Sequence, residues 1–428
     1  MTCQETHEDA ISAQAPGPRS MVDCDMNIVL LGSFPYPHGM AVTRHAALLL
    51  KGLQDAAGVS LRVVILRQSS QGNVPTGSHQ GIPYETVAPD CFRAKAVLTA
   101  PWWYAKAARV IRRAFQPGRK NVLLVYDPPC WENLPVVWQA RRLGFKVVFF
   151  IMEDNDLACR ISRSIWHRVK NALTRHATRQ TPQVANGLAV ISSHLETKFR
   201  ALTTGRVPIH HLPILVDMAR YPEQPRLFGD TITLLYCGSF GVKDGVPVLL
   251  DAFDKLAGRF ENLRLVLTGK GPKQVMQPVL ARIGASPYRG RIRYLGCLDE
   301  DAYYATLNAA DIPCMTRVNT GYANAGFPFK LGEFLATGKP TIASRVSDVE
   351  RLLADRRDAM LVRPDSSEDV VSAVEYLVTD AKRAASIGLC GRKKACQRFD
   401  YQRQSEAFLR FMAGLWDGKG AEEKRNLA

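Results

Sequence analysis

Short apolar runs alternate with helix-like amphipathic segments along most of this chain. Residues 26–32 form the first run, which is almost wholly apolar and ends in glycine; a Pro/Gly loop and a helical pattern over residues 41–53 follow it. Strands buried on both faces of a parallel sheet show such continuous apolar runs. A strand, a glycine-containing loop and a helix, in this order, predict the opening of a doubly wound domain.

The alternation continues toward the end of the chain, with helix-like segments such as residues 134–143, 193–202 and 368–411 between the runs. It favours an α/β protein with mostly parallel sheets. We expect the further strands at residues 62–66, 121–126, 146–151, 187–191, 231–236, 263–271, 291–296, 311–315 and 341–344.

Two segments break the alternation. Residues 67–90 are rich in Gly, Pro and Ser, which predicts a long exposed loop. Prolines at positions 208, 213, 222 and 225 predict a linker between two domains. We therefore divide the chain into a polar tail (1–25), a first domain (26–210), a linker (211–228), a second domain (229–400) and a last helix with a tail (401–428).

Composition sets the class of protein. The 428 residues suffice for two domains with separate cores, and 46% hydrophobic and 22% charged residues are ordinary for a globular protein. No apolar run approaches the length of a membrane span. The first 25 residues lack the apolar core of a signal peptide, and we expect both ends to be disordered.

The ten cysteines form no CxxC pair, which favours a reduced, cytoplasmic chain.

The positive charge is concentrated in the first half. Lys and Arg exceed Asp and Glu by 11 in residues 1–210 and by 5 in residues 211–428, so an anionic partner is expected. Residues 91–120 and 157–181 hold eight and six basic residues, respectively, and no acid. If a helix starts at Pro101, the basic residues Lys106, Arg109 and Arg113 share one face, opposite Trp103, Ala107, Val110 and Ala114. Solvated helix faces are the alternative interpretation.

The chemistry is concentrated in residues 326–344. Pro328 suits the first turn of a helix, and Leu331, Phe334 and Leu335 form one apolar stripe that ends before Gly338. Lys330 and Glu333 would share the opposite face, close to the helix N-terminus, which attracts anions. A carboxylate there can accept from both ribose hydroxyls and a lysine can hold a diphosphate. The alternative is a surface lysine beside a helix-capping glutamate.

This segment resembles the donor-site motif of glycosyltransferase family 4, the group 1 glycosyltransferases of GT-B architecture. It is similar to the variant that carries Pro, Lys and Glu, then an apolar pair, a small residue, Gly and Pro; here these are Pro328, Lys330, Glu333, Phe334, Leu335, Ala336, Gly338 and Pro340. The resemblance covers roughly residues 26–415. It implies two doubly wound Rossmann-like domains that face each other across a cleft, with the final segment crossing back onto the first domain.

The resemblance implies further site residues. In the loop 238–245 (GSFGVKDG), Gly238 and Lys243 match the family's diphosphate loop, but Ser239 replaces its usual arginine. Gly269 would lie near the donor nucleotide. Gly39 matches one glycine of a pair that faces the acceptor and the donor phosphate, with Met40 at the second position.

A further acid of the family is missing here. Many relatives carry an acid eight residues before Glu333, where this chain has Ala325. The resemblance implies a histidine or an acid that follows the strand at residues 146–151 and points at the reacting sugar; Asp154 is the candidate, with Glu153 and Asp156 as rivals. A DxD pattern can also hold a metal, and an acid here can simply cap the next helix, but the Lys/Glu motif belongs to the metal-free plan, so no metal and no cofactor are expected.

We therefore predict a glycosyltransferase that moves a sugar from a nucleotide-diphosphate sugar to an acceptor hydroxyl, as in the synthesis of bacterial surface polysaccharide or glycolipid. The acceptor would be a glycan or a lipid-linked glycan. Lys106, Arg109, Arg112 and Arg113 would face anionic headgroups, with Trp102, Trp103 and Tyr104 at the interface, on the inner face of the plasma membrane. The alternatives are a GT-B-fold nucleotide-sugar epimerase and a nucleic-acid-binding protein, although no recognition motif for nucleic acid is present.

Overall fold

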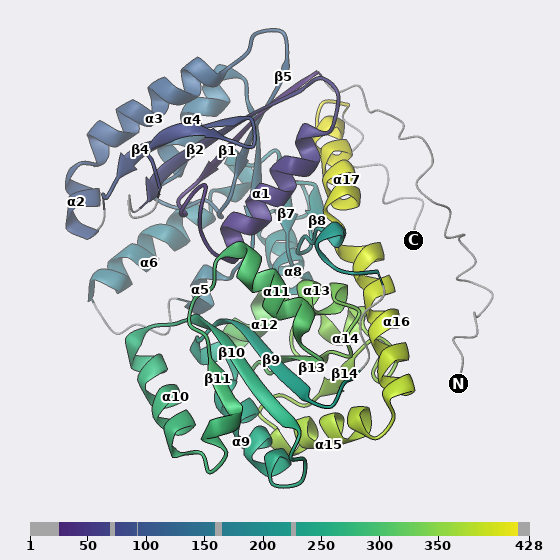
Figure 1. The fold of residues 1–428 in the computed structure, drawn as a ribbon. Coiled ribbons are helices and arrows are strands. Elements are labelled where there is room, and N and C mark those ends of the chain that lie inside the picture. Colours follow the sequence, from purple (N-terminus) through teal and green to yellow (C-terminus); the bar gives the residue numbers. More distant parts are fainter. Residues whose placement is uncertain (1–24, 69–72, 92, 159–164, 224–227, 418–428) are drawn as a thin grey trace.

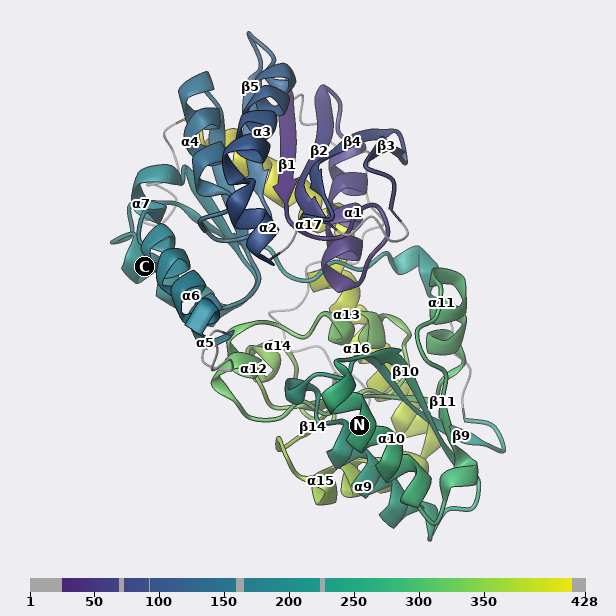
Figure 2. The ribbon, with the colours of Figure 1, turned by 90° about the vertical axis from the view of Figure 1, so that its left-hand side faces the viewer.

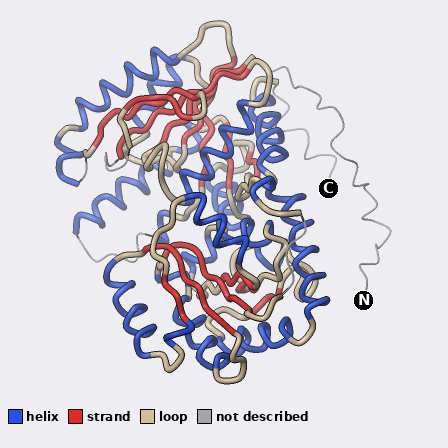
Figure 3. Tube along the Cα trace, viewed as in Figure 1, coloured by secondary structure: helices blue, strands red, loops and turns tan. Residues whose placement is uncertain are grey.

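The computed structural model describes residues 25–68, 73–91, 93–158, 165–223 and 228–417. Residues 1–24 of the predicted tail 1–25, and residues 418–428 at the other end, lie outside these ranges. Arg160 and Arg163, two of the six basic residues in 157–181, also lie outside them. The described residues form two lobes, each with its own sheet and surrounding helices (Figure 1). In Figure 3, where strands are red, the two sheets are seen as two separate groups of strands. The linker and the domain boundaries stay predictions. Along the sequence, the strands of the first sheet end at His211 and those of the second begin at Ile232.

The first sheet has eight strands in the order β3-β4-β2-β1-β5-β6-β7-β8, and all but β3 are parallel to their neighbours. The central strand, β1, is buried at every position, which explains its continuous apolar run. The strands are β1 (Met26–Gly32), β2 (Val59–Gln68), β3 (Thr76–His79), β4 (Ile82–Pro89), β5 (Lys120–Val125), β6 (Lys146–Ile151), β7 (Gly187–Val190) and β8 (Ile209–His211).

The expectation of a long exposed loop at residues 67–90 is wrong. The strands β3 and β4 form an antiparallel hairpin there, with a two-residue turn at Gln80 and Gly81, which have φ angles of 51° and 80°. Positive φ at both turn residues matches the twist of a hairpin. Ile82, Tyr84 and Thr86 are buried at alternate positions, so the segment carries the period-two pattern of a strand in spite of its Gly and Pro content.

The second sheet is wholly parallel, with six strands in the order β11-β10-β9-β12-β13-β14. Its carboxyl ends carry the glycine-rich loops that the sequence predicts to bind a donor. The strands are β9 (Ile232–Ser239), β10 (Leu263–Lys270), β11 (Ile292–Tyr294), β12 (Ile312–Met315), β13 (Ile342–Ser344) and β14 (Met360–Val362).

Helices connect the strands of both sheets. The first lobe contains α1 (Ala41–Gln54), α2 (Arg93–Leu98), α3 (Ala100–Ala114), α4 (Leu134–Leu143), α5 (Asn155–Ala158), α6 (Ile165–Thr178), α7 (Thr181–Val184) and α8 (Ser193–Leu202). The rest of the chain contains α9 (Val246–Ala257), α10 (Lys273–Ala285), α11 (Glu300–Ala309), α12 (Gly321–Ala325), α13 (Phe329–Ala336), α14 (Val349–Leu352), α15 (Ser367–Val378), α16 (Ala381–Phe399) and α17 (Tyr401–Gly414), with 3₁₀ turns η2 (Met218–Arg220), η3 (Val242–Asp244) and η4 (Arg289–Arg291).

The last helix, α17, returns to the first lobe and packs against α1, as Figure 2 shows. Ser405 Oγ donates to Leu49 O at 3.4 Å, and a Cβ on Gly52 would lie 2.4 Å from Ser405 Oγ. Where α16 meets α17, Val216 of the predicted linker exchanges backbone hydrogen bonds with Phe399 and Tyr401. Two segments therefore run side by side where the chain passes between the lobes.

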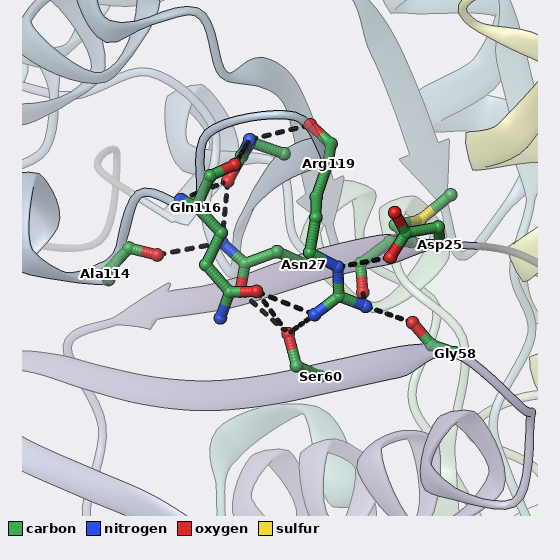
Figure 4. A network of polar contacts seen from close by, with 9 residues as sticks. Asp25, Asn27, Gly58, Ser60, Ala114, Gln116 and Arg119 are labelled. Atoms are coloured by element: carbon green, nitrogen blue, oxygen red, sulfur yellow. Dashed lines mark hydrogen bonds and ion pairs between the residues drawn. The ribbon is translucent and has the colours of Figure 1, made fainter.

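A polar network closes the end of the first sheet away from the glycine loop (Figure 4). Asn27 Nδ2 donates to Asn121 Oδ1 at 2.7 Å and to Ala114 O at 2.8 Å. Arg119 donates to Ser60 Oγ at 2.9 Å and also pairs with Asp25. Arg119 is thus one of the eight basic residues of 91–120 whose charge serves the fold.

Candidate functional site

The loop after β9 and the start of α13 meet at the edge of the second sheet that faces the first lobe. A Cβ on Gly238 would lie only 2.7 Å from Lys330 Nζ, so the loop backbone and the lysine are in direct contact. Gly238 has a φ of 144° and pairs with Gly269, whose own Cβ would lie 1.8 Å from Gly238 O. A larger residue at position 238 would collide with the lysine, and one at position 269 would collide with the backbone of Gly238.

Lys330 is buried, which corrects the expectation that it lies on a polar surface of the helix. Its Nζ donates to Tyr236 Oη at 2.8 Å and to Asp244 Oδ1 at 3.0 Å. Burial lowers the pKa of Lys330, and the Asp244 carboxylate acts in the opposite direction. This carboxylate, which the sequence interpretation overlooked, allows the ammonium group to lie inside the lobe.

Asp244 organises the loop that contains it. The carboxylate accepts from Ser239 Oγ at 2.8 Å and from the Gly241 backbone N–H at 3.0 Å. Burial opposes its ionisation, but Lys330 and Arg317 bring the pKa of Asp244 below its usual value. Ser239, which stands where the family pattern has an arginine, therefore supports the anion that holds Lys330.

Glu333 lies one turn along α13 and faces residues from two other elements. Tyr303 Oη of α11 donates to Glu333 Oε2 at 2.6 Å, and Arg44 Nη1 of α1 lies 3.6 Å from Glu333 Oε1. The Arg44 guanidinium also lies 4.3 Å from the centre of the Tyr303 ring. Neither Arg44 nor Tyr303 was predicted, because no motif around them marks them. The position of Arg44 in the helix after the glycine loop was the signal available.

Lys243 contacts the first lobe directly. Its Nζ lies 3.1 Å from Glu153 Oε1, and Tyr322 Oη donates to Glu153 Oε2 at 2.9 Å. Glu153 follows β6 in the first lobe, whereas Lys243 and Tyr322 belong to the second. The Glu153 carboxylate of the first lobe therefore contacts the second lobe at the predicted diphosphate loop.

Asp154 occupies a different environment from Glu153. It is 4% exposed, and its carboxylate contacts Lys198 Nζ at 2.6 Å and His194 Nε2 at 3.2 Å. Burial raises its pKa, but these hydrogen bonds outweigh burial, so the pKa of Asp154 lies below its usual value. Of the three rival acids, Glu153 is the one that contacts the predicted donor loop.

The position of Lys198 bears on whether Asp154 and Asp156 can bind a metal ion. Its Nζ lies 2.6 Å from Asp154 and 2.7 Å from Asp156, so an ammonium group stands between the two carboxylates of the DxD pattern. The described part of the chain holds no group of three or more His, Cys, Asp or Glu side chains arranged to bind a metal ion. This arrangement does not fit a divalent cation at these two aspartates.

A polar pocket of about 750 Å³ lies beside Asp154, between the two lobes. Ser193, at the start of α8, donates its backbone N–H to Asp348 Oδ2 of the second lobe at 2.7 Å. Ser192 Oγ donates to Ala325 O at 2.5 Å, at the position where many relatives carry an acid. The pocket is lined by Asp154, Asp156, Leu157, Ser193, His194, Thr197, Lys198, Asn319, Asn324, Arg345, Ser347 and Asp348.

Gly39 lies in the tight loop before α1. A Cβ there would lie 2.1 Å from Thr43 Oγ1, which donates to Pro35 O at 2.6 Å. The glycine therefore permits the close approach of the loop to the first turn of α1. The side chain of Met40, which stands in place of a second glycine, is 44% exposed.

The basic helix α3 begins where Pro101 predicts and buries Trp103, Ala107, Val110 and Ala114. Trp103 is wholly buried and donates its Nε1–H to Ala96 O at 2.9 Å, so its predicted place at a membrane interface is wrong. Lys106 Nζ donates to Val87 O at 2.9 Å. The exposed face is formed by Trp102, Arg109, Arg112 and Arg113. Within the described ranges, no helix combines the length and apolar character needed to cross a bilayer.

Two lobes with parallel sheets, whose strand ends face each other, define the GT-B class of fold. Similar solved structures are sucrose-phosphate synthase from Thermosynechococcus elongatus (TM-score 0.73, 14% identity, 92% of this chain and 100% of that one) and HepE of Anabaena in complex with UDP (TM-score 0.67, 15% identity, 91% and 100%). At these identities the likeness concerns the fold alone. The predicted fold class is confirmed.

The sequence comparisons agree with the predicted resemblance. Residues 231–380 match the model described as "Glycosyl transferases group 1". These residues contain the donor-site motif, and the predicted resemblance to the group 1 glycosyltransferases is confirmed.

Two curated relatives are mannosyltransferases. A GDP-mannose-dependent alpha-(1-6)-phosphatidylinositol monomannoside mannosyltransferase of Mycolicibacterium smegmatis is 22% identical over 58% of this chain and 68% of its own length. A phosphatidyl-myo-inositol mannosyltransferase of Mycobacterium tuberculosis H37Rv is 29% identical over 46% of this chain and 52% of its own length. The matches thus span between half and about two thirds of these relatives.

Proposed function

We propose that this glycosyltransferase transfers a hexose from a nucleoside diphosphate sugar to a hydroxyl group of a lipid-linked acceptor. The observation that carries the proposal is the contact of Lys330 with the Gly238–Gly245 loop, which also contains Lys243, with Glu333 one turn further along the helix of Lys330. The names of the mannosyltransferase relatives support GDP-mannose as the first donor to test and a phosphatidylinositol lipid as the first acceptor.

The roles follow from charge and position. Glu333 would accept hydrogen bonds from the ribose hydroxyls, while Lys330, Lys243 and the glycine backbone at residues 238 and 269 would hold the diphosphate. Negative charge develops on the leaving nucleoside diphosphate, and fixed cations beside it lower the barrier. These groups need no metal ion to supply positive charge.

Glu153 is the acid that we assign to the reacting sugar, in preference to Asp154. Its carboxylate reaches across the cleft to Lys243 and Tyr322 and is about half exposed, so a donor sugar could replace part of its present contacts. Asp154 is enclosed by Lys198 and His194 and would instead hold the backbone after β6 in place.

The polar pocket beside Asp154 would receive hydroxyl groups of the acceptor. Its lining is rich in amides and hydroxyls, from Asn319, Asn324 and Thr197, which suit a polyol headgroup. The exposed arginines of α3 and Trp102 would hold the enzyme at the cytoplasmic face of an anionic membrane.

The test is nucleotide binding by Glu333→Ala. Loss of charge-assisted hydrogen bonds to the ribose should weaken binding of GDP or UDP, whichever the parent protein binds, by about 2–3 kcal/mol in calorimetry. Glu261→Ala, an exposed carboxylate at the opposite end of β10, is the control and should bind normally. Equal affinities of Glu333→Ala and the parent would remove Glu333 from the site.

Product analysis separates the proposal from an epimerase. With GDP-mannose and a phosphatidylinositol lipid, a transferase yields a glycolipid and GDP. An epimerase converts the nucleotide sugar without any acceptor. Accumulation of an isomeric nucleotide sugar in the absence of lipid would therefore overturn the transferase assignment.

A further inference from the structure

Arg317 is a buried cation that the proposed roles leave unused. It follows β12, is 6% exposed, and its Nε has no hydrogen-bond partner. Its Nη1 donates to Ala323 O at 3.3 Å, and Arg317 forms no ion pair with any carboxylate among the described residues. A buried polar group without a partner is rare and calls for an explanation.

The residues on either side of Arg317 contact the proposed diphosphate loop, residues 238–245. Thr316 Oγ1 donates to Gly245 O at 3.2 Å, and the Val318 backbone N–H donates to Lys243 O at 3.2 Å, so residues 316–318 run alongside residues 243–245. A Cβ on Gly245, which has a φ of 60°, would lie 1.7 Å from Thr316 O. The close approach of the two segments brings Arg317 near Asp244, whose pKa the Arg317 charge helps to lower.

The charges in this cluster do not balance. Lys330, Lys243 and Arg317 contribute three positive charges, whereas Asp244 and Glu153 contribute two negative charges. Besides burial, the Arg317 charge contributes to lowering the pKa of Lys330, which means that the two cations repel each other. Because an uncompensated buried charge is strongly unfavourable, the cluster lacks one negative group.

We propose that Arg317 binds the donor diphosphate together with Lys330, in the role that the family pattern gives to an arginine at position 239. A diphosphate restores the charge balance, and a guanidinium group suits phosphate oxygens because its N–H groups form a planar fork. Arg317 then receives the charge that develops on the leaving group. This inference rests on the proposed donor class and adds a residue to it.

The test compares Arg317→Met, Arg317→Lys and the control Arg289→Met, whose arginine is exposed at the far end of β11. Inorganic pyrophosphate, GDP and UDP are the probes, followed by calorimetry and thermal unfolding. Arg317→Met should lose at least about tenfold in affinity for pyrophosphate and for the nucleotide, with partial recovery in Arg317→Lys. Arg289→Met should bind like the parent protein.

Stability without ligand separates binding from a structural role. If Arg317 is retained for an anion, removal of its unbalanced charge should leave the melting temperature of the ligand-free protein unchanged or raise it. A lower melting temperature combined with unchanged pyrophosphate affinity would overturn the proposal.

The two proposals also fail differently. If the parent protein binds pyrophosphate through Arg317 but no nucleotide, the anion site stands and the proposed donor class fails. If the parent protein binds GDP or UDP and Arg317→Met binds it equally well, the Arg317 inference fails and the donor class stands.

Discussion

Single residues at the cleft differ in where their partners come from. Asp154 finds Lys198 and His194 within its own lobe, whereas Glu153, one position earlier, finds Lys243 and Tyr322 in the other lobe. Successive side chains point in different directions, which a sequence pattern cannot resolve once the strand has ended. The motif spacing predicted a shared site for Lys330, Glu333 and Lys243, and Lys330 does contact the loop at Gly238. Arg44, Tyr303 and Arg317 were missed because they come from elements without a motif.

The buried environment of Asp154 predicts a pH-dependent contribution to stability. Because its pKa is lowered on folding, its stabilising effect is complete above the ordinary value of 3.8 and is lost as the pH falls through the folded-state pKa. Asp154→Asn should reduce the free energy of unfolding at neutral pH by about 1–3 kcal/mol, measured with denaturant. The difference should shrink at lower pH.

The control for this prediction is Asp301→Asn, since the Asp301 side chain is 97% exposed. It should leave the free energy of unfolding unchanged. An Asp154→Asn protein as stable as the parent at neutral pH would show that the contacts with Lys198 and His194 contribute nothing to the fold.

At the scale of elements, the amphipathic pattern predicted helix α3 and its buried face, but not which exposed side chains are free. Lys106 is held by the backbone of β4 and Trp103 by the end of α2. The hairpin of β3 and β4 was missed because Gly and Pro outweighed the alternation of buried positions. Such long-range contacts and hairpin pairing depend on neighbours that are distant in sequence.

The exposed arginines of α3 predict binding to anionic vesicles. Each basic residue near such a surface contributes about 1 kcal/mol, so replacement of Arg109, Arg112 and Arg113 by Gln should abolish sedimentation with vesicles that contain anionic lipid. Nucleotide binding should persist, because α3 is remote from Glu333 in the fold. High salt should release the parent protein from the vesicles.

A matched control replaces three arginines of the second lobe, Arg289, Arg293 and Arg356, which are also exposed. This variant has the same net charge as the α3 variant and should still sediment with the vesicles. If both variants lose binding equally, net charge and not the α3 surface holds the protein at the membrane.

At the scale of the whole molecule, alternating apolar runs were enough to predict two doubly wound lobes. The approach of the lobes was not predictable, because it depends on single polar contacts. Glu153 bonds Lys243 and Tyr322, Asp348 accepts from Ser193, and Arg44 lies 3.6 Å from Glu333. Several of these residues are the ones assigned to the donor, so the present contacts and the donor share the same groups.

Weakening these contacts should open the molecule. A partly exposed ion pair such as Glu153–Lys243 contributes about 0.2–1 kcal/mol, and the buried Asp348 accepts from Ser193 of the other lobe. The double variant Glu153→Gln, Asp348→Asn should therefore shift the balance toward separated lobes. Small-angle scattering should then give a larger radius of gyration than for the parent. The control Glu261→Gln, Asp301→Asn should not change it. An unchanged radius in the first variant would mean that the Glu153 and Asp348 carboxylates do not hold the lobes together.

The packing of α17 against α1 affects how the protein folds while it is being synthesised on the ribosome. The first lobe is translated first, yet the helix that covers α1 begins only at Tyr401. Until translation nears its end, the side of α1 that carries Gly52 has no partner from α17. We therefore expect the nascent first lobe to expose this side of α1 during most of its synthesis.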